Sequence, residues 1–409
     1  MTKFFRIAAR NVFRNPRRTS FTLLVIVFGA VSLILAGGFI ANNFQGLREL
    51  TIRNGIGHLQ IFTNAYLNGP EERPLQLGIE NPAALQTWLE AQPHVVATAP
   101  EVEFVGLISN GEKSEAFLGR GIDPTRQADL GFNVNMKSGR PLGAGTGESE
   151  VILGTGLATN MKAHVGDALT LLGTTTDGAL NAIDVRVVGF FSTGIKEFDA
   201  RALKVSVPTA QMLLGSTRVT KLIVKLDETG NTELARAAIA AGLVTKGRTD
   251  LGLRTWRDLA SFYKQVVMLY SSIFLFLGVI IVILVVLSSS NTMMMTVFER
   301  VQEIGTLLAL GTRRRHIVLI FLFEGLVIGA IGGVLGCIAG YGSMLGINAA
   351  GIIMPPPPSF DRGIALNINF VPSLYAAVFA LIATTLVISA MIPSIRAARL
   401  HIVDALRHV

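Results

Sequence analysis

The chain has 409 residues, half of them hydrophobic (50%), and a mean hydropathy of +0.51. This composition is too apolar for an ordinary soluble protein, so membrane-spanning and soluble parts must alternate. The net charge of +8 is concentrated beside apolar runs, which fits membrane topology better than nucleic-acid binding. The single cysteine, Cys337, excludes a disulfide within the chain and a cysteine-based metal site.

The first 20 residues are basic and amphipathic. They hold six Lys or Arg residues and no acid, interleaved with apolar residues. We predict for 1–20 a helix that lies on the anionic inner leaflet and ends near Pro16. Residues 21–41 then form an apolar run long enough to span a bilayer. A signal peptide has the same order but a shorter apolar core of about 7–15 residues, so we interpret this run as a transmembrane helix.

Residues 42–264 have the composition of a soluble domain outside the membrane. Segments rich in β-branched residues and bounded by Gly, Asn or Asp predict strands. The predicted strands are His58–Phe62, Val102–Ile108, Ala116–Gly119, Glu150–Leu153, Ala168–Leu172, Asp184–Phe191, Leu203–Val207 and Lys221–Leu226. The predicted helices are Pro82–Gln92 with Asn81 as N-cap, Thr232–Ala241, and one that runs from Arg257 into the next span. We expect a large extracytoplasmic α+β domain with one core or two lobes.

This domain carries no recognisable catalytic or metal-binding motif. His58, His94 and His164 are far apart in the sequence, so each is predicted to be a surface or hydrogen-bonded histidine. The segment Gly106–Lys113 has the glycine spacing of a phosphate-binding loop. Glu112, however, occupies the position after the second glycine, where that loop requires lysine. We therefore interpret the domain as a binding or mechanical element without a catalytic residue or a metal.

A charged loop separates two further apolar runs. The predicted spans after the outer domain are 265–290, 317–345 and 370–393, and the loop is 291–316. Apolar residues recur in the loop at the spacing of one helix, which Gly311 is placed to end. They are Val297, Val301, Ile304 and Leu308. Such a helix could dock into a groove of a soluble partner or lie passively on the membrane surface.

The span 317–345 combines regularly spaced glycines with one acid. The glycines form two ladders with small residues four apart, which let transmembrane helices approach closely. The ladders are Gly325, Gly329, Gly333 and Gly332, Gly336, Gly340. The acid, Glu324, must face protein or water at that depth. A partner from Arg313–Arg315 or from the N-terminal helix is one interpretation, and a proton or substrate relay is the other.

The basic residues predict the topology. The segments 1–20, 291–316 and 394–409 hold 6, 4 and 3 of them, whereas the loop at 346–370 holds one. The positive-inside rule then places both termini in the cytoplasm and the large domain outside. The outer loop 346–369 contains the proline run Pro355–Pro358, which predicts a stiff extended segment. Residues 394–409 form a short basic cytoplasmic tail.

Three motifs resemble one known family. They are Ala9–Thr19, Asn291–Gly336 with Glu299-Arg300, Glu303-Ile304-Gly305 and Ala309-Leu310-Gly311, and Pro393–Arg399 with Asp404–Arg407. With four spans and a large outer domain, the chain resembles the permease subunits of ABC transporters of the FtsX/MacB/LolC-LolE superfamily (type VII). The chain differs from the usual pattern at Ile402, where a proline is common.

The resemblance implies a mechanism. Such permeases lack an ATPase, form a homodimer or a heterodimer with a sister permease, and bind two copies of a cytoplasmic ATPase that uses ATP and Mg²⁺. The charged loop would be the coupling helix, and motion would be transmitted to a MacB-like periplasmic core domain. The candidate coupling residues are Glu299, Arg300, Glu303, Ile304, Gly305, Leu308, Gly311, Arg313, Arg314 and Arg315. Further expected partners are membrane lipid and a periplasmic carrier or adaptor, but no nucleic acid.

Several functions remain open at this point. The chain length and the lack of a fused ATPase favour a branch that acts on lipoproteins or other amphipathic envelope substrates. The coupling loop looks closer to the MacB type, which exports peptides or small molecules with periplasmic partners. A membrane-anchored receptor or scaffold would need no ATPase, and an autonomous ion-coupled transporter would depend on Glu324. In each case the chain is expected in the inner membrane.

Overall fold

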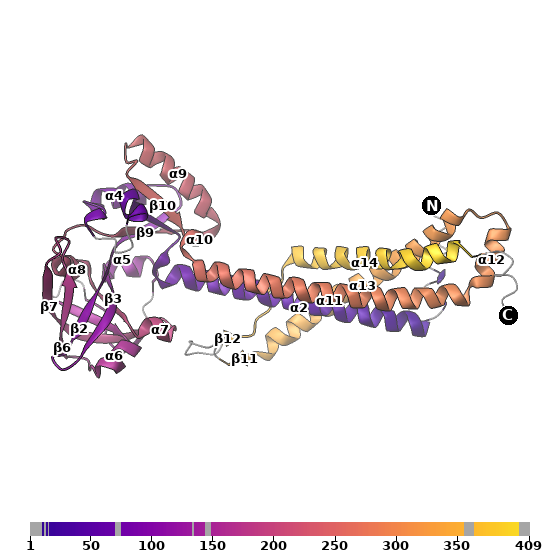
Figure 1. Cartoon of the computed structure of the whole chain (residues 1–409), viewed down its shortest axis with the longest axis horizontal. Coiled ribbons are helices and arrows are strands. Elements are labelled where there is room, and N and C mark those ends of the chain that lie inside the picture. The colour runs from indigo at the N-terminus through magenta and orange to yellow at the C-terminus, as the bar shows by residue number, and fades with distance from the viewer. Residues whose placement is uncertain are drawn as a thin grey trace. The chain divides into compact units, whose positions relative to one another are not determined.

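Figure 1 shows the computed structural model, which describes residues 10–11, 14, 16–69, 75–132, 135–143, 149–355 and 364–400. For residues 18, 54 and 364 it describes the backbone but not the side chain. Most of the predicted N-terminal helix, three of the four consecutive prolines and the end of the basic tail therefore lie outside the described residues. The chain divides into two compact units. The helical unit comprises 1–45, 266–354 and 365–409, and the outer unit comprises 46–265 and 355–364.

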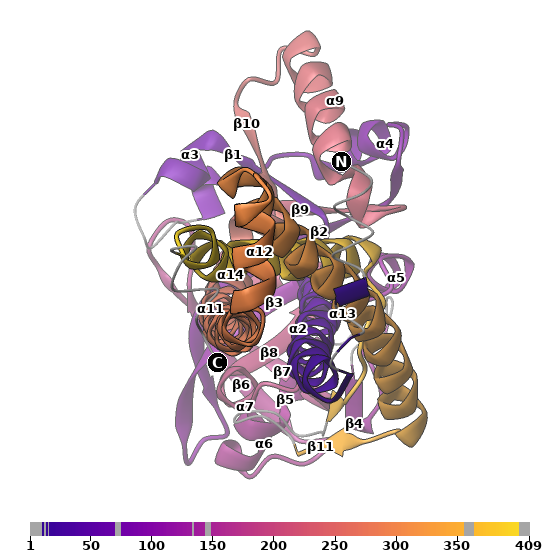
Figure 2. The same ribbon diagram turned by 90° about the vertical axis from the view of Figure 1, so that its right-hand side faces the viewer.

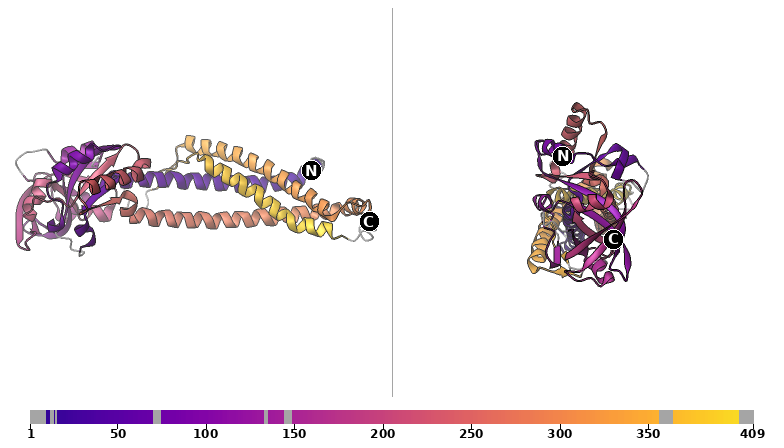
Figure 3. Two further views of the ribbon diagram at one scale, coloured as in Figure 1. Left: turned by 90° about the horizontal axis from the view of Figure 1, so that it is seen from above. Right: turned by 90° about the vertical axis from the view of Figure 1, so that its left-hand side faces the viewer.

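Four long helices build the helical unit, and Figure 3 shows them from above. They are α2 (Pro16–Thr51), α11 (Ser261–Glu299), α13 (Arg314–Ala350) and α14 (Pro372–Ala398). Among the described residues, these four are long and apolar enough to cross a membrane. Helix α2 starts ahead of the predicted residue 21 because proline is well tolerated in the first turn. Helix α14 continues through Pro393, so the start of the predicted tail is helical.

The core of the helical unit lies where α2, α11, α13 and α14 meet. Ala30 and Leu386 are fully buried there. The other buried members of this cluster are Ile26, Leu33, Ile34, Val285, Met293, Val327, Ile328, Val378, Ile382 and Ala390. Many outward-facing leucines, isoleucines and phenylalanines of the same helices are exposed, as expected of helices solvated by lipid or by a second subunit.

One sheet organises the outer unit. Its strands are β1 (Leu59–Thr63), β2 (Val95–Ser109), β3 (Ser114–Ile122), β4 (Asn135–Gly139), β5 (Glu150–Gly154), β6 (Ala168–Thr174), β7 (Leu180–Ser192), β8 (Ala202–Ser206), β9 (Lys221–Leu226) and β10 (Leu251–Thr255). In the described part of the chain their order is β10-β1-β9-β2-β3-β8-β5-β7-β4. Strands β4 and β10 were not predicted, because Gly, Asn and charged residues interrupt their pattern.

Strand β2 joins the two halves of this sheet. Its first part pairs with β9 and its second part with β3, while its end also pairs with β6. Strand β6 pairs with β7 as well, so β2, β3, β8, β5, β7 and β6 form a closed ring. The two parts of the sheet therefore share strand β2. The sequence left open whether the domain has one core or two lobes, and the shared strand joins both parts in a single sheet.

Short helices cover the sheet. They are η1 (Ile52–Ile56), α3 (Asn64–Asn68), η2 (Leu75–Leu77), α4 (Pro82–Glu90), α5 (Pro124–Asp129), α6 (Thr155–Met161), α7 (Lys196–Asp199), α8 (Val207–Leu214), η3 (Thr229–Asn231), α9 (Thr232–Thr245) and α10 (Trp256–Leu259). Helices α4, α6, α8 and α9, which are labelled in Figure 1, contribute buried apolar residues to the main core of the sheet. Two short strands, β11 (Ile353–Met354) and β12 (Ile364–Ala365), complete the described elements.

Two predicted helix starts differ in detail. Asn81 is the N-cap residue of α4 as predicted, but its side chain makes no capping hydrogen bond, because its backbone is left-handed with φ of 47°. The helix predicted from Arg257 is interrupted at Ala260, whose φ of −85° and ψ of 66° are not helical. A capping box between Thr255 and Asp258 starts α10, and α11 begins separately at Ser261.

Candidate functional site

The loop between α11 and α13 contains two helices where one was predicted. Helix α11 runs on to Glu299, and α12 (Val301–Ala309) follows after Arg300, whose φ of −115° and ψ of 18° break the helix. Gly311 adopts a φ of +88°, and its N–H donates to the Leu308 carbonyl, which closes the end of α12. Figure 2 shows α12 across the end of the helical unit. The prediction of one continuous helix from Val297 is therefore wrong.

The apolar face of α12 is buried against its own chain. Val301, Ile304 and Gly305 are buried, and Leu308 is partly buried. Ile304 belongs to a cluster that draws on α11, α13 and α14. The other buried members are Val297, Ile317, Phe321, Ala397 and Ala398. This face is not available to a partner while it is packed in this way, so a partner would contact α12 through its other side.

The opposite side of α12 is open. Gln302 and Thr306 are exposed, and so are Leu307 and Leu310, with exposed fractions of 39% and 79%. We call Leu307 and Leu310 the leucine pair. Sequence reasoning did not include the pair among the coupling residues, because neither leucine belongs to the apolar stripe. The sequence did contain a signal for this surface, because two leucines of a charged loop lie outside its apolar stripe.

The predicted charged residues lie around this helix. Glu299 and Arg313, Arg314 and Arg315 are exposed. Arg313 precedes α13, while the next two arginines lie in its first turn. Within the candidate set, Glu299 and Arg313–Arg315 are therefore exposed charges that a partner can reach, whereas Ile304, Gly305 and Leu308 lie on the packed side of α12.

Glu303 connects α12 to two arginines. Its carboxylate accepts from Arg300 Nε at 2.9 Å and from Arg14 Nη1 at 2.5 Å. Burial opposes ionisation, but the hydrogen bonds from Arg300 and Arg14 lower the pKa of Glu303 below its usual value. The contact with Arg14 links the N-terminal segment to α12, although both side chains are largely exposed and such pairs stabilise little.

Glu324 has a different partner from the one predicted. It is 5% exposed, and its Oε2 lies 3.7 Å from Arg300 Nη1. The predicted partners were Arg313–Arg315 or the N-terminal helix. The break at Arg300 turns that side chain toward α13, which the spacing of the sequence does not reveal.

The two glycine ladders of α13 face different helices. A Cβ at Gly325, Gly329 or Gly333 would contact α14, at Leu386, Ala383 and Phe379. A Cβ at Gly332, Gly336 or Gly340 would contact α2, at Ile26, Ala30 and Ile34. Helix α13 therefore lies between α2 and α14, and close approach on both sides depends on glycine.

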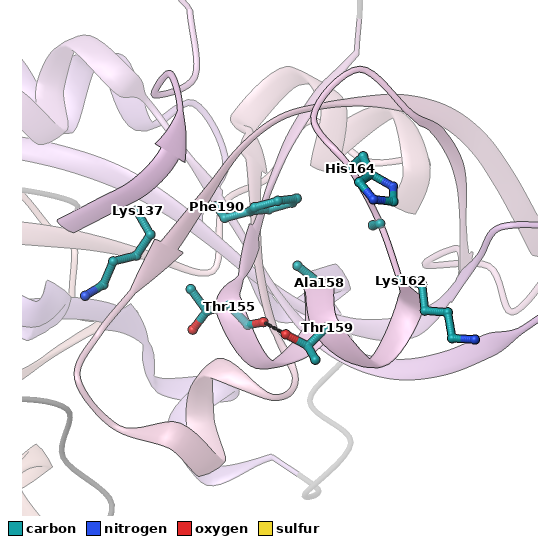
Figure 4. A pocket seen from close by; sticks show the side chains of 8 residues that line it. Lys137, Thr155, Ala158, Thr159, Lys162, His164 and Phe190 are labelled. Carbon is teal, nitrogen blue, oxygen red and sulfur yellow. Dashed lines mark hydrogen bonds between the residues drawn. The ribbon is translucent and has the colours of Figure 1, made fainter.

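Two of the cavities formed by described residues of the outer unit have titratable side chains in their walls. One of about 480 Å³ is lined by Lys137, Thr155, Ala158, Thr159, Lys162, Ala163, His164 and Phe190. Figure 4 shows that the ammonium groups of Lys137 and Lys162 point away from each other, so these charges do not converge on one ligand. The other, of about 580 Å³, contains His58 in its wall. Among the described residues, no group of His, Cys, Asp or Glu could hold a metal ion.

His58 is a buried, neutral hydrogen-bonding residue. It is 7% exposed, and its Nδ1 accepts the Leu226 N–H at 3.2 Å. The ring proton therefore sits on Nε2, which lies 3.2 Å from Thr229 Oγ1 and donates to it. Burial is the main cause that lowers the pKa of His58 below 6.5. The charged groups around it are Arg48, Glu49, Lys225 and Asp227.

This burial predicts a pH dependence of the outer unit. The unfolded chain takes up the His58 proton near pH 6.5, before the folded chain does. Stability is therefore highest above that pH and falls as the pH drops through it, by at most about 1.4 kcal/mol per pH unit. We expect His58→Gln to remove this part of the decline. The measurement is thermal unfolding of the full chain by tryptophan fluorescence on both sides of pH 6.5, and an equal decline in both proteins would contradict it.

Family models match both units of the chain. The MacB-like periplasmic core domain matches residues 19–241, and the FtsX-like permease C-terminal model matches residues 272–402. The "Uncharacterized ABC transporter permease YvrN" of Bacillus subtilis is 25% identical over 435 residues, 100% of both chains. The "Lipoprotein-releasing system transmembrane protein LolC" of Neisseria meningitidis is 25% identical, over 66% of this chain and 65% of that one.

The chain is also similar to two MacB proteins. The "Macrolide export ATP-binding/permease protein MacB" of Escherichia coli is 24% identical over 82% of this chain, which spans about half (52%) of that protein. The periplasmic region of MacB from Actinobacillus actinomycetemcomitans has been solved. It covers 52% of this chain, and 95% of that structure is matched, with 18% identity and a TM-score of 0.37.

Proposed function

The chain belongs to the family of MacB-like and FtsX-like ABC transporter permeases, and from this premise we propose that it transmits the work of a separate cytoplasmic ATPase to its outer unit. In this proposal the chain binds no cofactor. ATP and Mg²⁺ are used by two ATPase copies, and a second permease, identical or a sister, completes the dimer. Both termini lie in the cytoplasm of a cell whose inner membrane the chain spans, and the outer unit lies outside.

The arrangement of α12 carries this proposal. One face of the helix packs against α11, α13 and α14 through the cluster of Ile304, and Gly305 is buried next to it in the chain. The other face presents the leucine pair beside the exposed Arg313–Arg315. A helix that is anchored on one side and exposes leucines and charges on the other suits contact with a soluble motor protein.

The proposed substrate is a lipoprotein or another amphipathic molecule of the envelope. An exposed apolar strip on the outer unit supports this proposal. It consists of Val105, Leu107 and Leu118, with exposed fractions of 66%, 48% and 44%. Val105 and Leu118 are paired neighbours on β2 and β3, so the strip is continuous across the two strands. Acyl chains or amphipathic peptides bind to such surfaces.

Two alternatives make different predictions. MacB-type export of peptides or small molecules would need periplasmic partners on the outer unit but the same ATPase contact. A receptor or scaffold would need no ATPase, so changes in the leucine pair would leave its function unaltered. The leucine pair therefore separates the transporter proposals from the receptor alternative.

Leu310→Asp tests the ATPase contact. We expect at least about a tenfold loss of co-purified ATPase and of ATP turnover, because a charge replaces an exposed anchor of the interface. The measurement is affinity purification of the full chain from native membranes in mild detergent, with mass spectrometry and an ATPase assay. Leu180→Asp is the matched control, because Leu180 is equally exposed (79%) but lies in the outer unit. Unchanged turnover in Leu310→Asp would contradict the proposal.

A further inference from the structure

Arg300 stands at the junction of three elements of the helical unit. It occupies the break between α11 and α12, and its side chain is 17% exposed. Its guanidinium uses two different nitrogens for two carboxylates. Nε donates to Glu303 on α12 at 2.9 Å, and Nη1 lies 3.7 Å from Glu324 Oε2 on α13. A planar guanidinium held at two points is fixed in orientation as well as in position.

Glu324 lies between the two apolar clusters of the helical unit. Phe321, one turn before it, belongs to the cluster that holds α12, and Ile328, one turn after it, belongs to the main helical core. All three side chains are therefore on one buried face of α13. The side chain of Glu324 is 7% exposed, and its Oε2 lacks a hydrogen-bond partner. The carboxylate is thus placed where a change at α12 can reach the helical core.

A buried acid of this kind is costly to retain for stability alone. Replacing a buried ion pair with apolar residues is often neutral or stabilising, so the pair calls for another role. The Arg300–Glu324 separation of 3.7 Å is also longer than a charge-assisted hydrogen bond of about 2.7–2.9 Å. A displacement of α12 by about 1 Å toward α13 would close this gap and form the bond.

We propose that Arg300 and Glu324 are positioning residues that transmit displacement of α12 to α13. This inference rests on the proposed function, because it needs an ATPase to move α12. Hydrophobic contacts around Ile304 keep α12 attached, whereas the ion pair fixes its position along α13. Without the ion pair, α12 slides over the apolar residues that it contacts, and its displacement does not move α13.

The test is hydrogen–deuterium exchange of the assembled complex, purified through this chain from native membranes and measured with and without ATP and Mg²⁺. In the wild type we expect ATP to change exchange in α12 and in the outer unit. In Glu324→Gln we expect the change in α12 and the ATP turnover to persist, while the change in the outer unit is lost. Arg300→Lys keeps the charge and should retain part of the change in the outer unit.

Ser389→Ala is the matched control for loss of a buried polar contact. Ser389 Oγ donates to Ser289 Oγ between α14 and α11 at 3.0 Å, away from α12. We expect this variant to behave as the wild type. If Ser389→Ala also loses the change in the outer unit, the effect is general destabilisation and the proposal is overturned.

The remaining outcomes separate the inference from the proposed function. A wild type without any ATP-dependent change in α12 would overturn both. A normal change in the outer unit of Glu324→Gln would overturn the inference alone. If the Glu324→Gln complex does not assemble, Glu324→Asp tests the inference instead. Aspartate keeps the negative charge but is one methylene shorter, so its carboxylate lies farther from Arg300. Reduced transmission in the assembled Glu324→Asp complex supports the proposal, and full transmission overturns it.

Discussion

Replacing Gly336 with leucine is expected to force α2 and α13 apart. A Cβ at this position would lie 2.4 Å from the Cβ of Ala30, which is fully buried in the bundle core. Neither residue has a flexible side chain that could move away, so the helices themselves must shift. Overpacking a core lowers the free energy of unfolding by about 1–3 kcal/mol. We expect the upper end of this range here, because Ala30 cannot move away from the new side chain. We expect a lower thermal midpoint of the detergent-solubilised chain and loss of ATP-coupled activity.

Gly342→Leu is the matched control for this prediction. Gly342 lies on the same helix, but a Cβ there would meet nothing within 4 Å. It tests the cost of changing a glycine in α13 without the clash. The measurement is the thermal midpoint by size-exclusion chromatography after heating. Equal midpoints for the two variants would show that α13 does not pack on α2 through the ladder of Gly332, Gly336 and Gly340.

Lys221→Met is expected to destabilise the outer unit strongly. Lys221 is 5% exposed, and its Nζ lies 3.1 Å from Glu101 and 2.5 Å from Glu103. Burial acts to lower the pKa of Lys221, yet the two carboxylates together raise it above its usual value. Glu101 is 1% exposed, so the substitution leaves a buried carboxylate whose other cation, Arg120, lies 4.0 Å away through its Nε. Breaking a buried pair in this way costs about 3–5 kcal/mol.

The loss can be measured by urea unfolding of the full chain. The chain has two tryptophans, Trp88 and Trp256, and both belong to the outer unit, so fluorescence follows that unit. Arg236→Met is the control, because its pair with Glu233 at 2.8 Å is exposed and should contribute about 0–1 kcal/mol. Similar losses in the two variants would contradict the argument that burial makes the Lys221 pair important.

The four membrane helices follow from the sequence alone, because a long apolar run has one stable solution in a bilayer. The outer strands with strong β-branched patterns were also predictable, and Lys221–Leu226 has the predicted bounds. Strands β4 and β10 were not predicted. Their own composition does not favour a strand, and they adopt one because they pair with β7 and β1. The spacing of the glycines predicted two packing stripes on α13, but not which helix each stripe contacts.

The inner loop shows most clearly what the tertiary structure decided. Apolar residues at helical spacing indicate that one face is buried, but a partner and the rest of the same chain can bury it equally well. Contacts with α13 and α14 made this face internal and left the leucine pair exposed. The partner of Glu324 depended likewise on the break at Arg300. The sequence by itself determined the membrane spans, the domain order and the family, because these depend on local composition and motifs. The tertiary structure decided which surfaces are free and which charges meet, because both depend on contacts between distant segments.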